Sequence, residues 1–323
     1  MPGLTASAVN RSLDDDGYAV VDHILDPTDD LQPLLADFAG VLDQLAGKLL
    51  AGGEVTSTYA ELPFGPRLIR LTRECGHSLS QHFDLALPNG GIRSETPIHI
   101  SAAVFAVLTN PRLLDLAEEL LGPEIAVSPV GHVRIKLPEG TLPDGGDGLM
   151  AQIPWHQDNG VVLEEADGID VLTVWIPVNA ATIPNGCMQV VPTSRRHDLQ
   201  PHCPADKKGL HIPDPFVDED RAVPLPMEAG SVLLMHPRTI HSSLPNLTED
   251  QVRISLDLRY QPADQPTGRP MFPSFIARSR SNPERELRDW RVWSQQWLDV
   301  RARLAADPPP AYNRWDPNAP ACA

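Results

Sequence analysis

Residues 154–160 read PWHQDNG, and this stretch near the middle of the chain decides how the rest is interpreted. In an extended strand alternate side chains point the same way, so His156 and Asp158 would lie on one face. Two ligands could then reach one metal ion without distortion of the backbone. A third ligand has to come from elsewhere, and we expect His241, which follows a predicted strand at Ser231–Met235.

The alternative third ligand is His236, which lies at the edge of the same segment. The spacing from His241 to Arg253 favours His241, whereas a ligand at His236 would stretch that spacing. Two imidazoles and one carboxylate on one side of a metal form the facial triad, which leaves open positions and suits Fe(II). The sequence therefore predicts a ferrous ion bound by His156, Asp158 and His241.

Residues 253–260 read RISLDLRY and alternate between polar and apolar side chains. As a strand they present one polar face, which consists of Arg253, Ser255, Asp257 and Arg259. A guanidinium can bind a carboxylate through two parallel hydrogen bonds, as the distal carboxylate of 2-oxoglutarate requires. Arg253 is the expected anchor for that carboxylate, whereas Arg259 is expected to form an ion pair with Asp257 or another carboxylate.

The run from Trp155 to Tyr260 resembles the phytanoyl-CoA dioxygenase family of Fe(II)/2-oxoglutarate oxygenases. The matching motifs, in order, are HQD at 156–158, TVWIP at 173–177, NGCMQVVP at 185–192, HSS at 241–243 and RIS at 253–255. This ordered set is far more specific than the HxD pair alone. One departure is Thr193, which stands where the family usually has a glycine; it concerns the local turn and not the metal site.

The resemblance implies a mainly β protein with flanking helices around a double-stranded β-helix, which is a jelly-roll, cupin-like core. It implies the same three iron ligands and Arg253 as the anchor for 2-oxoglutarate. By motif position Ser243 is implied to assist Arg253. Three further residues are implied to line the cosubstrate pocket, and they are Lys136, Gln157 and Trp175.

By the same resemblance we expect an enzyme, a dioxygenase that uses 2-oxoglutarate and O2 as cosubstrates. The expected reaction is hydroxylation of an unactivated C–H bond of a small molecule in secondary metabolism, with desaturation or cyclisation as variants. Asp158 disfavours halogenation, because halogenating relatives lack this carboxylate. Two other classes are a non-catalytic jelly-roll binding protein, which predicts a broken triad or a missing arginine, and a cupin-type hydrolase or isomerase, which needs no carboxylate anchor.

We predict a single domain over residues 1–323, with a helical part at about 1–125, the jelly-roll core at about 126–262 and a helix at about 283–305. Helical spacing of apolar residues predicts helices at Leu31–Leu50, Arg112–Leu121 and Pro283–Leu304. Runs of β-forming residues predict strands at Tyr18–Val21, Gly131–Pro138, Val171–Val178, Met188–Val191, Ser231–Met235 and Arg253–Tyr260. The substrate pocket is expected to be shaped by Cys75–His99, Glu139–Gln152 and a proline-rich candidate lid, His197–Leu225.

The net charge of −17 argues against nucleic acid or an anionic membrane surface as a partner, because like charges repel. A small-molecule substrate is expected, and the oligomeric state stays open. No apolar stretch is long enough to span a bilayer, and no secretory leader is visible. The four cysteines lack CxxC spacing, so we expect free thiols in a cytoplasmic protein; they are Cys75, Cys187, Cys203 and Cys322.

Overall fold

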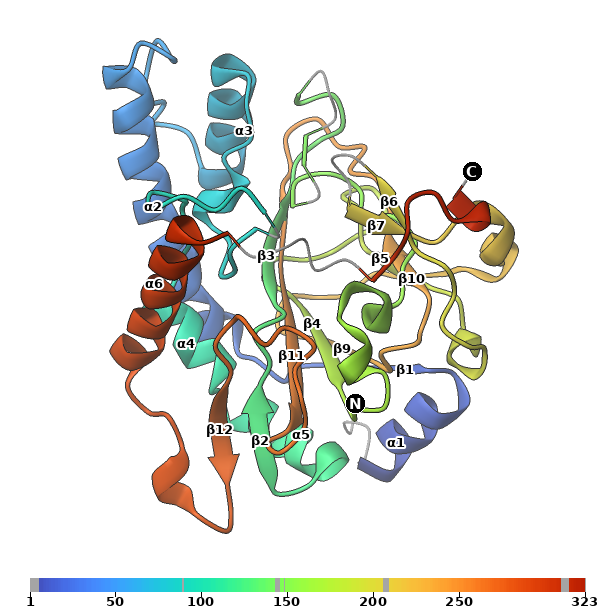
Figure 1. Ribbon diagram of the computed structural model, residues 1–323. Coiled ribbons are helices and arrows are strands. Elements are labelled where there is room, and N and C mark those ends of the chain that lie inside the picture. The colour runs from blue at the N-terminus through green and yellow to red at the C-terminus, as the bar shows by residue number, and fades with distance from the viewer. Residues whose placement is uncertain are drawn as a thin grey trace.

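Figure 1 shows the computed structural model, in which a β core is covered on one side by helices from both ends of the chain. The structure describes residues 6–88, 90–142, 146–147, 149–205, 209–308 and 314–322. The long green and orange strands cross the middle of the molecule, and the smaller strands lie to their right in Figure 1.

The larger sheet is antiparallel and has seven strands in the part of the chain that the structure describes. Its order is β1 (Tyr18–Val21), β9 (Val232–Met235), β4 (Leu172–Pro177), β11 (Arg253–Pro262), β2 (Glu124–Val127) and β12 (Phe275–Ser279). The seventh strand, β3 (His132–Lys136), pairs with the beginning of β11 and places Lys136 opposite Arg253. Every residue of β4 is buried, because the sheet is covered on both faces.

A smaller antiparallel sheet faces the larger one, with the order β10 (His241–Ser243), β5 (Met188–Val190) and β8 (Val223–Leu225). Strands β6 (Cys203–Ala205) and β7 (Gly209–His211) form a separate hairpin. An isolated antiparallel bridge joins His156 to His241, so the HxD segment extends the smaller sheet. The predicted double-stranded β-helix with flanking helices is confirmed.

Helices α2 (Gln32–Ala51), α3 (Phe64–Cys75), α4 (Ala102–Leu108) and α6 (Trp290–Ala306) gather on one side of the larger sheet in Figure 1. The other two helices are α1 (Ala6–Asp15) and α5 (Pro111–Leu121). Phe105 of α4 stacks on Phe275 of β12 at 5.4 Å between ring centroids and lies 5.8 Å from the ring of Trp293. Trp293 and Trp297 are buried, so the C-terminal helix completes the core that the N-terminal helices begin.

The C-terminal helix starts later than predicted, at Trp290 instead of Pro283, because Asp289 caps it. The Asp289 carboxylate accepts from the Arg291 amide at 3.0 Å, whereas Pro283–Arg285 forms only a short 3₁₀ turn. The predicted elements did not include α3, α4, β2 or β12. α3 does have apolar residues at helical spacing, among them the buried Leu68 and Leu71, whereas β2 and β12 are only four and five residues long. The HxD segment is extended only as far as Gln157, and a 3₁₀ turn begins at Asp158.

The departure at Thr193 has a visible structural consequence. Thr193 has φ of 64°, in the left-handed region that favours glycine and disfavours β-branched residues. Its amide donates to the Asp16 carbonyl at 2.8 Å, and its hydroxyl accepts from Arg221 at 3.1 Å. Tertiary hydrogen bonds thus hold a threonine in a conformation that the family usually gives to glycine.

The expectation of four free thiols is wrong, because Cys203 and Cys322 form a disulfide across 119 residues. Cys75 and Cys187 are free. No spacing motif links Cys203 to Cys322, and only the docking of the C-terminal segment brings the two sulfurs together. Within the described ranges, no helix has both the length and the apolar character needed to cross a membrane.

Candidate active site

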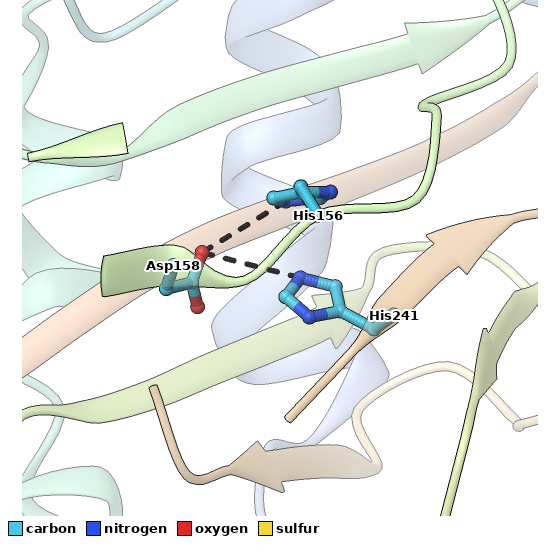
Figure 2. A group of neighbouring side chains, drawn as sticks. All are labelled: His156, Asp158 and His241. Atoms are coloured by element: carbon cyan, nitrogen blue, oxygen red, sulfur yellow. Dashed lines mark ion pairs between the residues drawn. The ribbon is translucent and has the colours of Figure 1, made fainter. Parts of the chain in front are cut away.

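Three side chains of the predicted triad meet in the interior of the β core (Figure 2). The ligand atoms of His156, Asp158 and His241 all lie within 4.8 Å of one another, and all three residues are buried. The Nε2 atoms of both histidines are 3.9 Å from Oδ1 of Asp158. This donor set of two imidazoles and one carboxylate fits a divalent first-row metal such as Fe(II).

Both histidines are held in the tautomer that a metal needs. Nδ1 of His156 lies 2.9 Å from the Pro154 carbonyl, and Nδ1 of His241 lies 2.9 Å from the Thr239 carbonyl. A carbonyl only accepts, so each Nδ1 carries the proton and each Nε2 presents its lone pair to the triad. Reciprocal amide bonds of 3.0 Å between His156 and His241 fix the two backbones against each other.

The carboxylate of Asp158 is fixed through both oxygens. Arg259 donates to Oδ1, and the hydroxyl of Thr173 donates to Oδ2. Burial alone would raise the pKa of Asp158, but Arg259 and the two neighbouring histidines outweigh it and hold the pKa below its usual value. Burial, followed by His241, lowers the pKa of His156, which favours the neutral ligand form. The ion pair expected for Arg259 therefore forms, and its nearest carboxylate is the metal-site residue Asp158.

A second group, of positive charge, lies where β3 meets β11. Arg253 is fully buried with its guanidinium carbon 5.4 Å from the ring centre of Trp175, and it donates to the Gly186 carbonyl at 3.2 Å. Lys136 is equally buried and donates to the Ser243 hydroxyl at 2.6 Å. Among the described residues neither cation forms an ion pair. Burial, together with adjacent arginines, lowers the pKa of Lys136 to about 6 and that of Arg253 to about 9.

Two adjacent buried cations without a counterion are unfavourable unless an anion completes them. Ser243 links this cation pair to the triad, since it lies two residues after His241 in β10. Its hydroxyl accepts from Lys136 and also from the Ile153 amide at 2.9 Å. The structure thus brings together four of the predicted cofactor-binding residues, which are Lys136, Trp175, Ser243 and Arg253.

The fifth, Gln157, lies apart from this group. Its Nε2 donates to the Arg238 carbonyl at 2.8 Å, and its Oε1 accepts from the Gln200 amide at 2.7 Å. Its side chain is fully buried, and alternation along the backbone turns it away from His156 and Asp158. The side-chain amide of Gln157 therefore links the loop that contains Arg238 to the loop that contains Gln200, beside the triad.

A cavity of about 450 Å³ adjoins the triad, with His156 and Arg259 in its wall. This volume lies in the range of small-molecule sites. The three loops expected to shape the pocket all contribute, through residues that include Leu87, Leu149 and Leu210.

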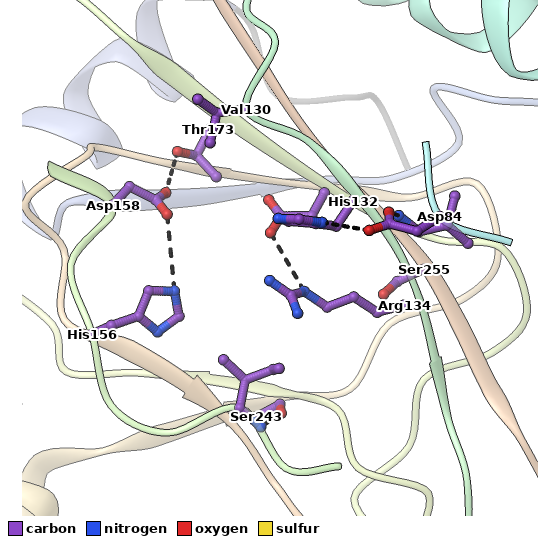
Figure 3. Close-up of polar contacts among 12 residues, drawn as sticks. Asp84, Val130, His132, Arg134, His156, Asp158, Thr173, Ser243 and Ser255 are labelled. Carbon is purple, nitrogen blue, oxygen red and sulfur yellow. Dashed lines mark hydrogen bonds and ion pairs between the residues drawn. The ribbon is translucent and has the colours of Figure 1, made fainter. Parts of the chain in front are cut away.

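Polar groups of β3 line the same cavity (Figure 3). Nδ1 of His132 lies 2.9 Å from Asp84, whose other oxygen accepts from the Val133 amide at 2.9 Å. The next outward residue, Arg134, lies 3.7 Å from Asp257. In the predicted strand Gly131–Pro138 the residues His132, Arg134 and Lys136 alternate with apolar ones, so these basic side chains share one face. Nothing in the sequence indicated Asp84, which comes from the loop after α3.

The fold and the site define a jelly-roll protein with a facial triad and, apart from it, the buried basic side chains of Lys136 and Arg253. The protein belongs to the phytanoyl-CoA dioxygenase family, whose sequence model matches residues 13–255. It is 29% identical to phytanoyl-CoA dioxygenase 1 of Oryza sativa subsp. japonica over 31% of this chain and 36% of that protein. It is 26% identical to 1-deoxypentalenic acid 11-beta-hydroxylase of Streptomyces arenae over 54% of this chain and 62% of the relative.

These matches span less than two thirds of either curated relative. Among solved structures, the non-heme monooxygenase ThoJ in its apo form has the same fold, with a TM-score of 0.55 and 20% identity. That alignment covers 93% of this chain and 99% of the other. The two proteins thus share their fold over nearly the whole of this chain, including the helices that flank the β core.

Proposed function

We propose that this protein is an Fe(II)- and 2-oxoglutarate-dependent dioxygenase that hydroxylates an unactivated C–H bond of a small molecule. The observation that carries the proposal is the pairing of two complementary sites in one core. One site offers three metal ligands, and the other offers two buried basic side chains that have only neutral hydrogen-bond partners among the described residues.

His156, Asp158 and His241 would hold the iron, because their donor atoms converge and their protonation states are preset. The iron, when bound with 2-oxoglutarate and O2, supplies an oxidant that removes hydrogen from a substrate C–H bond as 2-oxoglutarate becomes succinate and CO2. Arg259 and Thr173 keep the Asp158 carboxylate oriented toward the two imidazoles.

Arg253 and Lys136 would bind the distal carboxylate of 2-oxoglutarate, and Ser243 would place that carboxylate between them and the triad. Burial of these two cations costs free energy when no anion is bound. A bound dicarboxylate offsets their charge, so its binding is favoured. Trp175 packs under the Arg253 guanidinium and limits the directions in which it can donate.

The substrate would occupy the cavity beside His156, with His132 as its polar contact. Nδ1 of His132 is engaged by Asp84, so Nε2 is left as an acceptor for a substrate hydroxyl or amide. The curated name of the Streptomyces relative, a hydroxylase of 1-deoxypentalenic acid, supports a role in secondary metabolism. Desaturation or cyclisation could arise at the same site if the substrate is held differently.

The proposal retains a cytoplasmic location and excludes nucleic acid and membrane partners on the ground of the acidic charge. The disulfide removes one support for that location, since disulfides persist mainly in oxidising compartments. A non-catalytic binding protein or a cupin-type hydrolase would not need the uncompensated cations, so the cation pair favours the oxygenase.

The test is conversion of labelled 2-oxoglutarate to succinate by protein loaded with Fe(II) in the presence of ascorbate and O2. Slow succinate formation is expected even without the substrate, and it should be lost in Asp158→Ala. Absence of succinate from protein with bound iron would contradict the proposal and favour the binding protein.

A further inference from the structure

The C-terminal segment, Arg314–Cys322, lies against the turn that carries the carboxylate ligand. In Figure 1 this red segment runs back toward β6 and β7, far from the helix that precedes it. Nε1 of Trp315 donates to the Gly160 carbonyl at 2.6 Å, and Gly160 lies two residues after Asp158 in the turn Asp158–Val161. The end of the chain therefore contacts the metal-site backbone directly.

Arg314 contacts the same turn and also forms an ion pair with Asp167, which follows the turn in the chain. Its guanidinium donates to both oxygens of Asp167 at 2.5 and 2.8 Å and to the Asn159 carbonyl at 3.4 Å. Bidentate pairs of this kind fix orientation as well as position. Arg314 and Trp315 thus donate hydrogen bonds to two consecutive backbone carbonyls of the turn, those of Asn159 and Gly160.

His202 supports the turn from a second direction. Its Nε2 accepts from the Gln157 amide at 2.9 Å, and its Nδ1 donates to the Gln200 carbonyl at 2.8 Å. Burial lowers the pKa of His202 to about 4, which keeps Nε2 available as an acceptor. A Cβ atom at Gly160 would come within 2.2 Å of the His202 ring, so this close approach requires glycine.

His202 and Trp315 also contact each other, and a covalent bond closes the arrangement. Their rings stack at 5.1 Å between centroids with 28° between the planes. The neighbour of His202 in the chain, Cys203, forms the disulfide with Cys322, at the end of the C-terminal segment. The candidate lid and the C-terminal segment are therefore joined over the turn that follows the HxD motif.

We propose that His202 and Trp315 are positioning residues of the metal site and that the Cys203–Cys322 disulfide keeps them in place. The inference rests on the proposed metal centre, because it concerns how Asp158 is aimed. Gln157 lies between the two ligands His156 and Asp158, and its amide is fixed by His202. The Gly160 carbonyl is fixed by Trp315, so both sides of Asp158 are held by this one assembly.

The probe is Co(II), whose visible bands report binding to the triad without 2-oxoglutarate, O2 or turnover. Loss of partners that orient metal ligands weakens metal affinity by about 10- to 100-fold. Trp315→Ala should therefore bind Co(II) at least about tenfold more weakly than the unaltered protein. Trp315→Phe keeps the ring and loses the N–H donor, so it should show a smaller loss of about threefold.

The matched control is Trp290→Phe on α6, away from the triad, because Arg291 lies 5.0 Å from the centre of the Trp290 ring as Arg314 lies 5.3 Å from that of Trp315. The control should bind Co(II) as the unaltered protein does. Hydrogen exchange gives a second readout, in which the amides of residues 159–161 should exchange faster in the Trp315 variants and not in the control.

The disulfide is tested by reduction with a dithiol, followed by alkylation and removal of the reagent. Two electrons and two protons convert the S–S bond to thiols at Cys203 and Cys322, while the dithiol becomes a cyclic disulfide. Reduced protein should bind Co(II) about tenfold more weakly, and Cys322→Ser should match it before treatment. The same treatment of Cys322→Ser should change nothing further.

Unchanged Co(II) affinity in Trp315→Phe and in the reduced protein, with native circular dichroism, would overturn the inference. If Trp315→Ala does not fold, Trp315→Phe and Cys322→Ser still decide it. The proposed function is judged separately by succinate formation in the untreated protein. If the protein forms no succinate but still binds Co(II), the comparison of Co(II) affinities among the variants remains valid. Failure of the proposed function can therefore be distinguished from failure of this inference.

Discussion

The metal triad and the Lys136–Arg253 cation pair lie in the same core but are charged in opposite ways. At the triad the groups around the metal ligands are already paired: Arg259 and Thr173 donate to Asp158, and backbone carbonyls accept from Nδ1 of both histidines. At the cation pair two positive groups are buried with neutral partners alone among the described residues. The first site is organised before its ligand arrives, whereas the second becomes electrostatically satisfied only when an anion binds.

The largest effect is expected for Asp158→Ala, which removes a ligand and leaves Arg259 buried without its carboxylate. Metal affinity should fall by more than about a hundredfold, beyond the effect of losing an outer partner. Equilibrium dialysis against Co(II) measures it, with the exposed Asp170→Ala as the control. Retained affinity would show that the three side chains are not the metal site.

The second-largest effect is expected for Arg253→Met, which should change 2-oxoglutarate binding without changing metal binding. Arg253→Met should weaken 2-oxoglutarate binding by about 30- to 100-fold, or about 2–3 kcal/mol, because a buried charged hydrogen bond is lost. Co(II) affinity should stay within about twofold. The free protein should be as stable as before or more so, since a buried cation without a counterion is removed.

Calorimetric titration and thermal unfolding of Arg253→Met check these three expectations, with the exposed Arg291→Met as the matched control. A loss of 2-oxoglutarate affinity accompanied by an equal loss of metal affinity would mean that the two regions are not separate. Unchanged 2-oxoglutarate affinity would place the cosubstrate elsewhere.

The cation pair should also give a pH dependence that the triad does not. Burial lowers the pKa of Lys136 from 10.5 to about 6, so between these values the unfolded chain binds one more proton than the folded protein. The contribution of Lys136 makes stability rise with pH across this window. A bound carboxylate favours charged lysine, so 2-oxoglutarate affinity should fall above pH 6, by at most about tenfold per pH unit.

Lys136→Met should flatten both pH dependences, which chemical denaturation and 2-oxoglutarate titration from pH 6 to 9 can measure. The Co(II) affinity at fixed pH serves as the internal control, since Lys136 is not a metal ligand. The same pH dependence in the variant and in the unaltered protein would assign it to another group.

The smallest effect is expected at the cavity wall. His132→Gln removes the ring acceptor held by Asp84, and it should raise KM for the substrate by about fivefold, the loss of roughly one hydrogen bond. Affinities for Co(II) and 2-oxoglutarate should not change. The ratio of substrate oxidised to succinate formed should fall, because a poorly held substrate misses the oxidant. A change in 2-oxoglutarate affinity instead would assign His132 to the cosubstrate site.

The convergence of His156 with Asp158 and the inward direction of Arg253 were predictable from the sequence because they depend on the alternation of side chains along a strand. His156 and Asp158 are two residues apart, and the backbone is extended up to Gln157 between them. The alternation of β11 aligned Arg253 with Arg259. The family resemblance supplied Lys136, Ser243 and Trp175, which the structure gathers around Arg253. These residues are encoded in strands whose period of two fixes the direction of each side chain.

The rest depends on contacts between distant segments. Asp84 reaches His132 from a loop 48 residues earlier, and Cys203 meets Cys322 across 119 residues. Arg259 was expected to pair with a carboxylate, but the sequence did not favour Asp158 over Asp257. His202 was not among the predicted site residues, because its contact with Trp315 forms only when the C-terminal segment packs against it. Contacts between residues far apart in the sequence depend on tertiary packing. They leave no periodic pattern in a single sequence from which they could be predicted.

The most direct test of the two-site account is an anaerobic titration of metal-free protein with Fe(II) and then 2-oxoglutarate, followed by visible absorption. The account predicts a metal-to-ligand charge-transfer band that is absent in His241→Ala and needs about 30-fold or more 2-oxoglutarate in Arg253→Ala. A protein that binds iron in its triad but shows no band at any 2-oxoglutarate concentration would contradict it.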